Sequence, residues 1–365
     1  MWFQKIINVA LQAAVLTVLL LIPYTISAPL IPQDPSQVDT WFNSVVTPYT
    51  NRTGSLDPDL VTAEAAANVI KVSKDGSGDF GTVADAIANV PEWNTRRTII
   101  KIGPGTYFEK ITIDQNKPFI TLYGSPNAVP TLVYNGTAAT FGTYNSATLI
   151  VLSDYFVAAN IIITNSAPMP DGKRQGAQAV ALRTSGDNQA FYNCAIMGYQ
   201  DTLLDDSGNH FFKDCYVQGT VDFIFGNGKS LYLGTELHVV KDGGVITAQG
   251  RESSTDQSQG YSFVHCNITG SKKGAYLGRA WKPSPLVVFA YTTMGKVVNS
   301  AGWSDNSHPK RDKTVFFGEY KCTGPGSSLR KRVKYTKKLD DESAVRFISL
   351  DFINATTWLL PVPTL

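Results

Sequence analysis

The stretch GYQDTLLDDSGNHFFKDCYVQGTVDFIFG, residues 198–226, decides the fold. Two blocks in and beside it share one form, FYNCAIMG at 191–198 and FKDCYVQG at 212–219, each a short apolar run closed by glycine. An aspartate follows each glycine three residues later, so Asp201 and Asp222 stand 21 positions apart, as do Cys194 and Cys215. A period of about 20 to 25 residues, built from short strands and turns, is typical of a solenoid. Because neighbouring coils of a parallel solenoid lie roughly 4.8 Å apart, the two carboxylates should lie side by side.

Such a carboxylate pair predicts acid–base and nucleophilic chemistry. Two adjacent carboxylates cannot both ionise easily, so the pair should carry one proton and one charge near neutral pH. Gln200 precedes Asp201, and Gln178 lies 22 residues before Gln200, about one coil back. Amide donors beside such a pair suit the stabilisation of an oxyanion. Aspartate in turns more often serves only the backbone, but the shared period and the nearby amides favour a functional site.

Composition and length limit the class of protein. The chain has 365 residues, 43% of them hydrophobic and 17% charged, with a net charge of +2. This balance argues against a nucleic-acid binder, which would carry a concentrated basic patch. The one dense basic run, residues 330–338, is interpreted as a solvated surface segment.

The N-terminus and the sequons indicate export. Residues 1–28 read as a secretory signal, with Lys5 before an apolar stretch and small residues at its end. No other candidate membrane span follows, so the mature protein is expected to be secreted, free of the membrane and monomeric. Four glycosylation sequons agree with this location, at Asn51, Asn135, Asn267 and Asn354. Of the four cysteines, Cys194 and Cys215 are the expected disulfide, which leaves Cys266 to pair with Cys322.

The rest of the chain predicts one all-β body. Residues 29–65, rich in proline, are expected to form an extended arm, and residues 66–365 a single solenoid domain. The first strand should cover 68–72, and a helix over 82–90 should cap the open end. Gly76, Gly78 and Gly81 leave a dinucleotide site as an alternative, although no acidic residue ends the next strand. Short apolar runs from 97 to about 320 indicate a β-helix with loops, and a helical tail over 340–353 should pack along its side.

Five blocks of this sequence resemble, in order, the signature blocks of plant pectin methylesterases. They are GTYFE at 105–109, QAVALR at 178–183, GYQDTL at 198–203, DFIFG at 222–226 and LGRAW at 277–281. The resemblance covers roughly residues 66–360. It implies a right-handed parallel β-helix that hydrolyses galacturonate methyl esters in cell-wall pectin without metal or cofactor, and it adds a proteinaceous inhibitor as a possible partner.

The resemblance also assigns roles to individual residues. Asp222 matches the nucleophile, Asp201 the general acid and base, Gln178 and Gln200 the oxyanion donors, and Arg279 the residue that orients the nucleophile. Trp281 and Trp303 match sugar-contacting aromatics, and the ring of Phe225 in the fourth block suits the same stacking. Ala280 stands where most members have proline, and residues 29–65 are too short to form the inhibitor-like pro-region of many plant members.

Three rival functions stay open at this point. A polygalacturonase would need several acidic residues in its active site. The acidic pair Asp205-Asp206 is instead interpreted as a solvated turn. A pectate lyase would need a cluster of acidic residues that binds calcium, and no such cluster surrounds Arg279 in the sequence. A pectin-binding homologue without activity would lack an Asp, Gln or Arg of the site, and all five are present.

Overall fold

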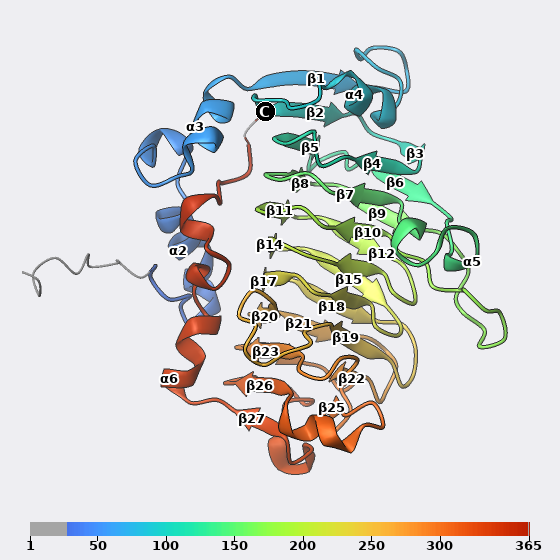
Figure 1. Cartoon of the computed structure of the whole chain (residues 1–365), viewed down its shortest axis with the longest axis vertical. Coiled ribbons are helices and arrows are strands. Elements are labelled where there is room, and N and C mark those ends of the chain that lie inside the picture. Colours follow the sequence, from blue (N-terminus) through green and yellow to red (C-terminus); the bar gives the residue numbers. More distant parts are fainter. Residues whose placement is uncertain (1–27, 364) are drawn as a thin grey trace, which may run out of the picture.

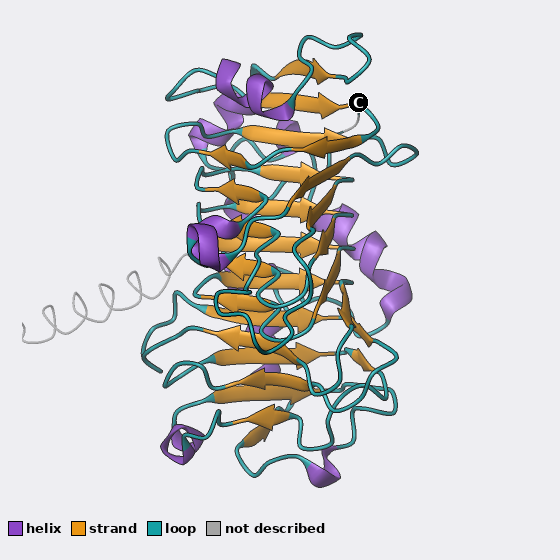
Figure 2. Cartoon of the chain, turned by 90° about the vertical axis from the view of Figure 1, so that its right-hand side faces the viewer, coloured by secondary structure: helices purple, strands orange, loops and turns teal. Residues whose placement is uncertain are grey.

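The computed structural model describes residues 28–363 and 365, and its body is a three-sided parallel β-helix (Figure 1). The signal expected over 1–28 therefore lies almost wholly outside the described residues. Each complete coil contributes one strand to each of three sheets, here called A, B and C, and the coils at the two ends add strands to sheet A alone. The strands of successive coils stack along the long axis (Figure 2). Every pairing between neighbouring strands is parallel, as in β10 with β13 or β14 with β17.

Sheet A has eleven strands and sheets B and C have eight each. Sheet A contains β1 (Asn68–Val72), β2 (Thr98–Ile102), β5 (Ile120–Gly124), β8 (Val157–Ala159), β11 (Gln189–Tyr192), β14 (Asn209–Lys213), β17 (Lys229–Leu233), β20 (Gly260–Val264), β23 (Leu286–Ala290), β26 (Phe316–Tyr320) and β27 (Thr336–Lys338). Sheet B contains β3 (Thr106–Phe108), β6 (Thr131–Tyr134), β9 (Ile162–Asn165), β12 (Ala195–Met197), β15 (Tyr216–Gly219), β18 (Glu236–Val239), β21 (Asn267–Thr269) and β24 (Thr293–Met294). Sheet C contains β4 (Ile111–Ile113), β7 (Leu149–Val151), β10 (Leu182–Thr184), β13 (Leu203–Asp205), β16 (Ile224–Gly226), β19 (Val245–Gln249), β22 (Tyr276–Arg279) and β25 (Trp303–Ser304).

A column of aromatic rings fills the interior behind sheet A. Its members occupy one register position in five successive strands, and their ring centroids lie 4.7, 4.5, 4.5 and 4.6 Å apart. The column consists of Phe191, Phe212, Tyr232, Phe263 and Phe289. This spacing matches the distance between hydrogen-bonded strands, so aromatic stacking and backbone pairing support the same register.

Sharp corners lead from sheet A to sheet B. The residue after the sheet A strand has a left-handed backbone in seven coils, with φ between 46° and 65°, at Asn160, Asn193, Asp214, Gly234, His265, Tyr291 and Lys321. Asparagine, aspartate and glycine adopt this conformation at least cost. Repetition of the corner turns the chain by the same angle in every coil, which keeps the sheets in register.

The cysteines follow these corners, and the expected disulfides are absent. All four are free thiols, and Cys194, Cys215 and Cys266 are fully buried in the core. Cys194 and Cys215 occupy adjacent coils, as the shared period predicts, but they are not bonded. Thr292 occupies the corresponding place in the coil between Cys266 and Cys322. Two coil spacings amount to about 10 Å, beyond the roughly 7 Å that a disulfide spans.

The helix α4 (Val83–Asn89) closes the N-terminal end of the solenoid, as predicted. Thr82 caps it by accepting a hydrogen bond from the Asp85 N–H at 3.1 Å, and Val83 and Ile87 are buried against the core. The Glu109 carboxylate accepts hydrogen bonds from the backbone N–H groups of Val83 and Ala84, at 3.1 and 2.8 Å. A side chain of the protein therefore occupies the helix N-terminus where a dinucleotide phosphate would bind, which excludes that alternative.

Residues 29–65 differ from the predicted extended arm. They contain α2 (Val38–Val45), α3 (Pro58–Ala65) and the short 3-10 turns η1 (Pro35–Gln37) and η2 (Tyr49–Asn51). Pro58 begins a helix, where its missing N–H costs nothing, and Phe42 stacks on Phe211 of sheet A at 5.7 Å. The arm thus packs on the outer face of sheet A.

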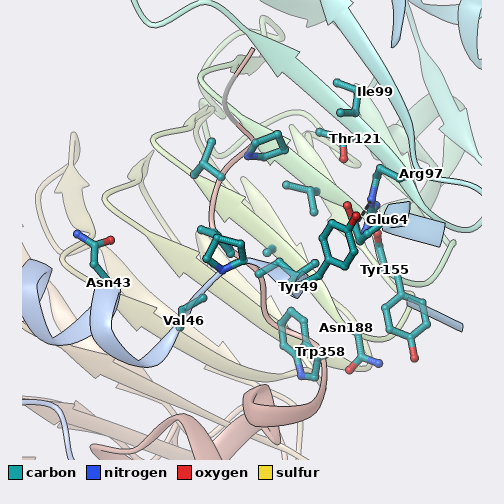
Figure 3. A pocket seen from close by; sticks show the side chains of 17 residues that line it. Asn43, Val46, Tyr49, Glu64, Arg97, Ile99, Thr121, Tyr155, Asn188 and Trp358 are labelled. Atoms are coloured by element: carbon teal, nitrogen blue, oxygen red, sulfur yellow. Dashed lines mark hydrogen bonds and ion pairs between the residues drawn. The ribbon is translucent and has the colours of Figure 1, made fainter. Parts of the chain in front are cut away.

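The C-terminal tail lies beside the arm on the same face, where it was expected (Figure 1). It begins with α6 (Asp341–Ala344) and continues through the 3-10 turns η6 (Val345–Phe347), η7 (Leu350–Ile353) and η8 (Ala355–Thr357). Arm, tail and sheet A enclose a cavity of about 460 Å³, lined by Trp358 and Tyr49 and bordered by the ion pair of Arg97 and Glu64 (Figure 3).

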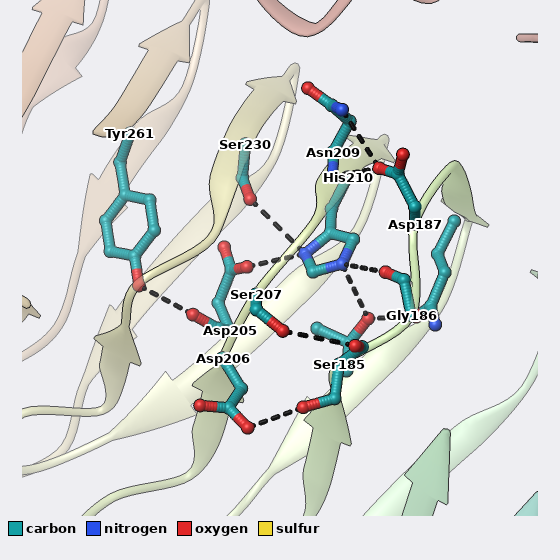
Figure 4. Close-up of polar contacts among 12 residues, drawn as sticks. Ser185, Gly186, Asp187, Asp205, Asp206, Ser207, Asn209, His210, Ser230 and Tyr261 are labelled. Atoms are coloured by element: carbon teal, nitrogen blue, oxygen red, sulfur yellow. Dashed lines mark hydrogen bonds and ion pairs between the residues drawn. The ribbon is translucent and has the colours of Figure 1, made fainter. Parts of the chain in front are cut away.

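A polar network is buried inside the solenoid (Figure 4). His210 Nδ1 lies 2.6 Å from Asp205 Oδ1, and His210 Nε2 lies 2.9 Å from the Gly186 carbonyl oxygen. Tyr232 donates its hydroxyl to Asp205 Oδ2 at 2.6 Å. Both ring nitrogens face acceptors, so the imidazole donates from both and carries a positive charge. Asp205 is fully buried, so the interpretation of Asp205-Asp206 as a solvated turn is wrong for Asp205.

Candidate active site

Asp201 and Asp222 lie in the connections from sheet B to sheet C of two successive coils. The strands that follow them pair with Leu203 opposite Ile224, which places the two aspartates one above the other. Both have a left-handed backbone, with φ of 64° and 51°, and the Asp201 N–H donates to the Val221 carbonyl at 3.1 Å. The predicted side-by-side arrangement of the pair is therefore confirmed.

Arg279 reaches this pair from the end of β22. Its Nε donates to Asp222 Oδ1 at 2.7 Å, and its Nη2 donates to Asp222 Oδ2, so the contact is bidentate. Its Nη1 donates to Asn306 Oδ1 at 2.8 Å. Such a fork fixes the position and the orientation of the carboxylate. Asp222 is therefore held in one orientation by a positively charged partner.

Asp201 has a different environment from Asp222. Burial raises the pKa of Asp201 well above its usual value of 3.8, the neighbouring Asp222 charge raises it further, and Arg279 offsets part of the increase. The two carboxyls therefore have unequal surroundings: the guanidinium of Arg279 holds Asp222, whereas burial and the neighbouring carboxylate favour the protonated form of Asp201.

Both predicted glutamines line the same cleft, whose volume is about 380 Å³. Gln178 and Gln200 lie in the sheet B to sheet C connections of neighbouring coils, and the Ala179 N–H donates to the Gln200 carbonyl at 3.2 Å. The Gln178 carbonyl accepts from Ala138 at 2.8 Å, which ties it to the helix α5 (Ala138–Phe141). The cleft is lined by Thr143, Tyr144, Gln178, Gln200, Asp201, Asp222, Phe225, Ala248, Arg279 and Trp281.

The floor of the cleft is apolar and lies on the outer face of sheet C. Phe225 and Ala248 form this floor, and Trp281 lies at its edge. Phe225 and Ala248 pack in an apolar cluster with Ala147, Ile150, Val180 and Leu204. The Phe225 and Trp281 rings meet edge to face, with centroids 6.4 Å apart. Two of the three predicted aromatics, Phe225 and Trp281, therefore line the cleft. Their apolar faces suit the C–H surface of a sugar ring.

Trp303, by contrast, lies in the core and not in the cleft. Gly278 pairs with Trp303 and Arg279 with Ser304, so Trp303 has the inward orientation of Gly278 and Ser304 the outward one of Arg279. The indole is 1% exposed, and its N–H donates to Glu319 at 3.1 Å. The expected sugar contact therefore does not form, because side chains alternate along the strand.

Four residues of the site were not predicted from the sequence: Thr143, Tyr144 and Ala248 line the cleft, and Asn306 contacts Arg279. Tyr144, in the 3-10 turn η3 (Tyr144–Ser146), lines the cleft and is 48% exposed, and the Arg183 guanidinium lies 5.1 Å above its ring. Asn306 holds Arg279 from a turn with φ of 57°. Tyr144 lies in an irregular connection and Asn306 in a loop, so neither shows a period. An aromatic residue in a polar connection is the one signal that points to Tyr144.

Comparison with known proteins agrees with this geometry. The sequence profile of the Pectinesterase family matches residues 69–356. The chain belongs to the pectinesterase family. It is 56% identical over 335 residues to "Putative pectinesterase 63" of Arabidopsis thaliana, covering 92% of this chain and 91% of that protein. It is 51% identical over 359 residues to "Pectinesterase 2" of Olea europaea, covering 97% of each.

Solved structures confirm the right-handed parallel β-helix. Pectin methylesterase from carrot matches with a TM-score of 0.71 at 30% identity, covering 81% of this chain and 98% of that one. A pectin methylesterase in complex with a hexasaccharide matches with a TM-score of 0.67 at 28% identity, covering 80% and 98%. In that related enzyme, the same fold therefore binds an oligosaccharide.

Proposed function

We propose that the chain hydrolyses the methyl esters of galacturonate units in pectin, releasing methanol and leaving carboxylates on the polymer. The observation that carries this proposal is the unequal aspartate pair, with Asp222 held by Arg279 and Asp201, whose pKa is raised by burial, one coil away in the same cleft. Family membership and the related hexasaccharide complex support the substrate class.

In the first half-reaction, a carboxylate oxygen of Asp222 attacks the ester carbonyl carbon. The resulting oxyanion accepts hydrogen bonds from the amides of Gln178 and Gln200. Collapse of this intermediate breaks the bond to the methoxy oxygen, which takes the proton of Asp201 and leaves as methanol. The product is an anhydride between Asp222 and the galacturonate.

The second half-reaction reverses the roles of the acid and base. Asp201, now ionised, removes a proton from water as the water oxygen attacks the anhydride carbonyl. The bond to Asp222 breaks, and Arg279 receives the restored carboxylate. Asp201 ends protonated and ready for another cycle, so neither a redox step nor an external proton donor is needed.

The rival functions make different predictions for one assay. An esterase releases methanol and leaves the uronide chain length unchanged, a hydrolase or lyase shortens the chain, and a binding homologue does neither. We expect methanol release from highly esterified pectin without change in chain length. Shortened chains without methanol would overturn the proposal.

The proposed location is the cell wall outside the cell. No helix among the described residues is long and apolar enough to cross a membrane. The asparagines of all four sequons, Asn51, Asn135, Asn267 and Asn354, are exposed in the structure and accessible to glycosylation. Loss of mass on treatment with a glycosidase would test whether they carry glycans.

A further inference from the structure

A patch of aromatic side chains lies on the same side of the solenoid as the cleft but outside it. Phe108 ends β3, Tyr134 ends β6 and Phe141 ends α5, and we call these three residues the aromatic platform. The Phe108 and Tyr134 ring centroids are 5.6 Å apart, and those of Tyr134 and Phe141 are 6.3 Å apart. Phe108 is 63% exposed. Tyr134 and Phe141 are half-buried, so the patch presents one exposed ring supported by two partly exposed ones. Exposed aromatic patches of this kind are candidate binding sites.

Lys110 adds an unpaired cation to the platform. Its Nζ lies 5.3 Å from the centre of the Phe141 ring, and it forms no ion pair with any residue in the described part of the chain. Burial lowers the pKa of Lys110. The adjacent Glu109 does not neutralise it, because both oxygens of that carboxylate bind the N-terminus of α4. This half-exposed ammonium can therefore pair with an anionic ligand group.

Lys110 is aligned with the catalytic aspartates along the axis of the solenoid. Ile111, directly after Lys110, pairs with Leu149, which pairs with Leu182, which pairs with Leu203 two residues after Asp201. Lys110 therefore lies in the same column of sheet B to sheet C connections as Asp201, three coils away, a distance of about 14 Å. Thr143 and Tyr144, which line the cleft, follow Phe141 in the chain and bridge the two sites.

We propose that the aromatic platform and Lys110 form a distal subsite for the same polyuronate chain, which binds a galacturonate unit that has already lost its methyl ester. The proposal rests on the proposed function. The rings contact the C–H face of the sugar, and the ammonium pairs with its carboxylate. A methyl ester is neutral and offers no such pairing, so the subsite favours partly de-esterified pectin over fully esterified pectin.

The test compares two long pectins, one fully methyl-esterified and one partly de-esterified, with the full chain and its variants. We expect Lys110→Met, which keeps the aliphatic contact with Phe141, to raise KM about fivefold on the partly de-esterified polymer. The kcat of this variant and its KM on the fully esterified polymer should stay unchanged. Phe108→Ala should raise KM on both polymers. The exposed residues Lys331 and Trp93 lie outside the platform, so Lys331→Met and Trp93→Ala are the matched controls and should behave as wild type.

The possible outcomes separate the two proposals. If wild type releases no methanol from either polymer, the proposed function fails. If wild type is active and Lys110→Met keeps the wild-type KM on both polymers, with a melting temperature that shows a folded protein, the distal subsite is wrong. A KM that rises equally on both polymers for Lys110→Met also overturns it, because the charge then has no role in selection.

Discussion

Arg279 binds both carboxylate oxygens of Asp222 through its Nε and Nη2, although 57 residues separate the two in the chain. The contact crosses two steps of sheet C, from β16 through β19 to β22. It makes the surroundings of the two stacked aspartates unequal, because the guanidinium fork holds Asp222 while burial raises the pKa of Asp201. The predictions below follow from this asymmetry and from the network that supports it.

Asp222→Asn should abolish methanol release, with a fall in kcat of about 10⁴-fold or more, as expected for loss of a nucleophile. Asp201→Asn should lower kcat by about 10²- to 10⁴-fold, the usual contribution of a general acid. Both amides keep the shape of the side chain, so circular dichroism should show the native fold. Appreciable turnover by purified Asp222→Asn would contradict the mechanism.

The pre-steady-state release of methanol should fall on the alkaline side of the pH profile. This first half-reaction needs the proton of Asp201, which is lost as pH rises through the raised pKa of that carboxyl. Stopped-flow detection of methanol across the pH range measures the step directly. An acylation rate that stays constant throughout the alkaline range would show that Asp201 is not the acid.

Asp201→Asn should be more stable than wild type at neutral pH. The folded-state pKa of Asp201 is raised, so folding favours the protonated form, and wild type loses stability as pH rises from the unfolded value of 3.8 through the folded one. Asparagine does not titrate and avoids this cost. Urea denaturation at acidic and at neutral pH should give a difference in unfolding free energy that grows with pH. An equal difference at both would refute the linkage.

His210→Ala should destabilise the fold by about 3 to 5 kcal/mol, because it leaves Asp205 buried without its partner. Burial alone lowers the pKa of His210, but the charge and hydrogen bond of Asp205 outweigh it and raise the pKa above the ordinary 6.5. The stabilisation is therefore complete below about 6.5 and is lost as pH rises through the folded pKa. The gap between the melting temperatures of wild type and variant should narrow at alkaline pH, because only the part due to the charge is lost; a constant gap would mean that the charge is unimportant.

The two tryptophans should respond in opposite ways. Trp281→Ala should raise KM for pectin and leave the melting temperature nearly unchanged, because the indole lines the cleft. Trp303→Ala should cost about 3 to 5 kcal/mol of stability, as expected for removing a large buried ring. Measuring KM and thermal melting for both variants checks the assignment. A folded, fully stable Trp303→Ala with a raised KM would restore the sugar contact that the sequence suggested.

Local repetition in the sequence was enough to predict the solenoid and the stacked pair. Each coil repeats one short pattern, so a period of 21 residues brings Asp201 beside Asp222 without knowledge of distant contacts. The helix that caps the N-terminal end was also predicted from local sequence, because Thr82 and the apolar residues after it are a signal for a helix start. The glutamines followed from the same spacing, and Arg279 came only from resemblance to the family.

The tertiary structure alone decided which way side chains face and which distant residues meet. Trp303 lies inside because strand pairing places it opposite Gly278, whose position faces the core. A register shifted by one residue would turn the indole to the outer face. Asn306 and Tyr144 reach the cleft from connections of irregular length, which no period describes. Asp205 faces the interior, where it contacts His210 of the next strand, so one of two adjacent acids in a polar sequence is buried. Repetition along the chain encodes the coil, whereas the environment of each side chain depends on strand register and loop packing that arise only on folding.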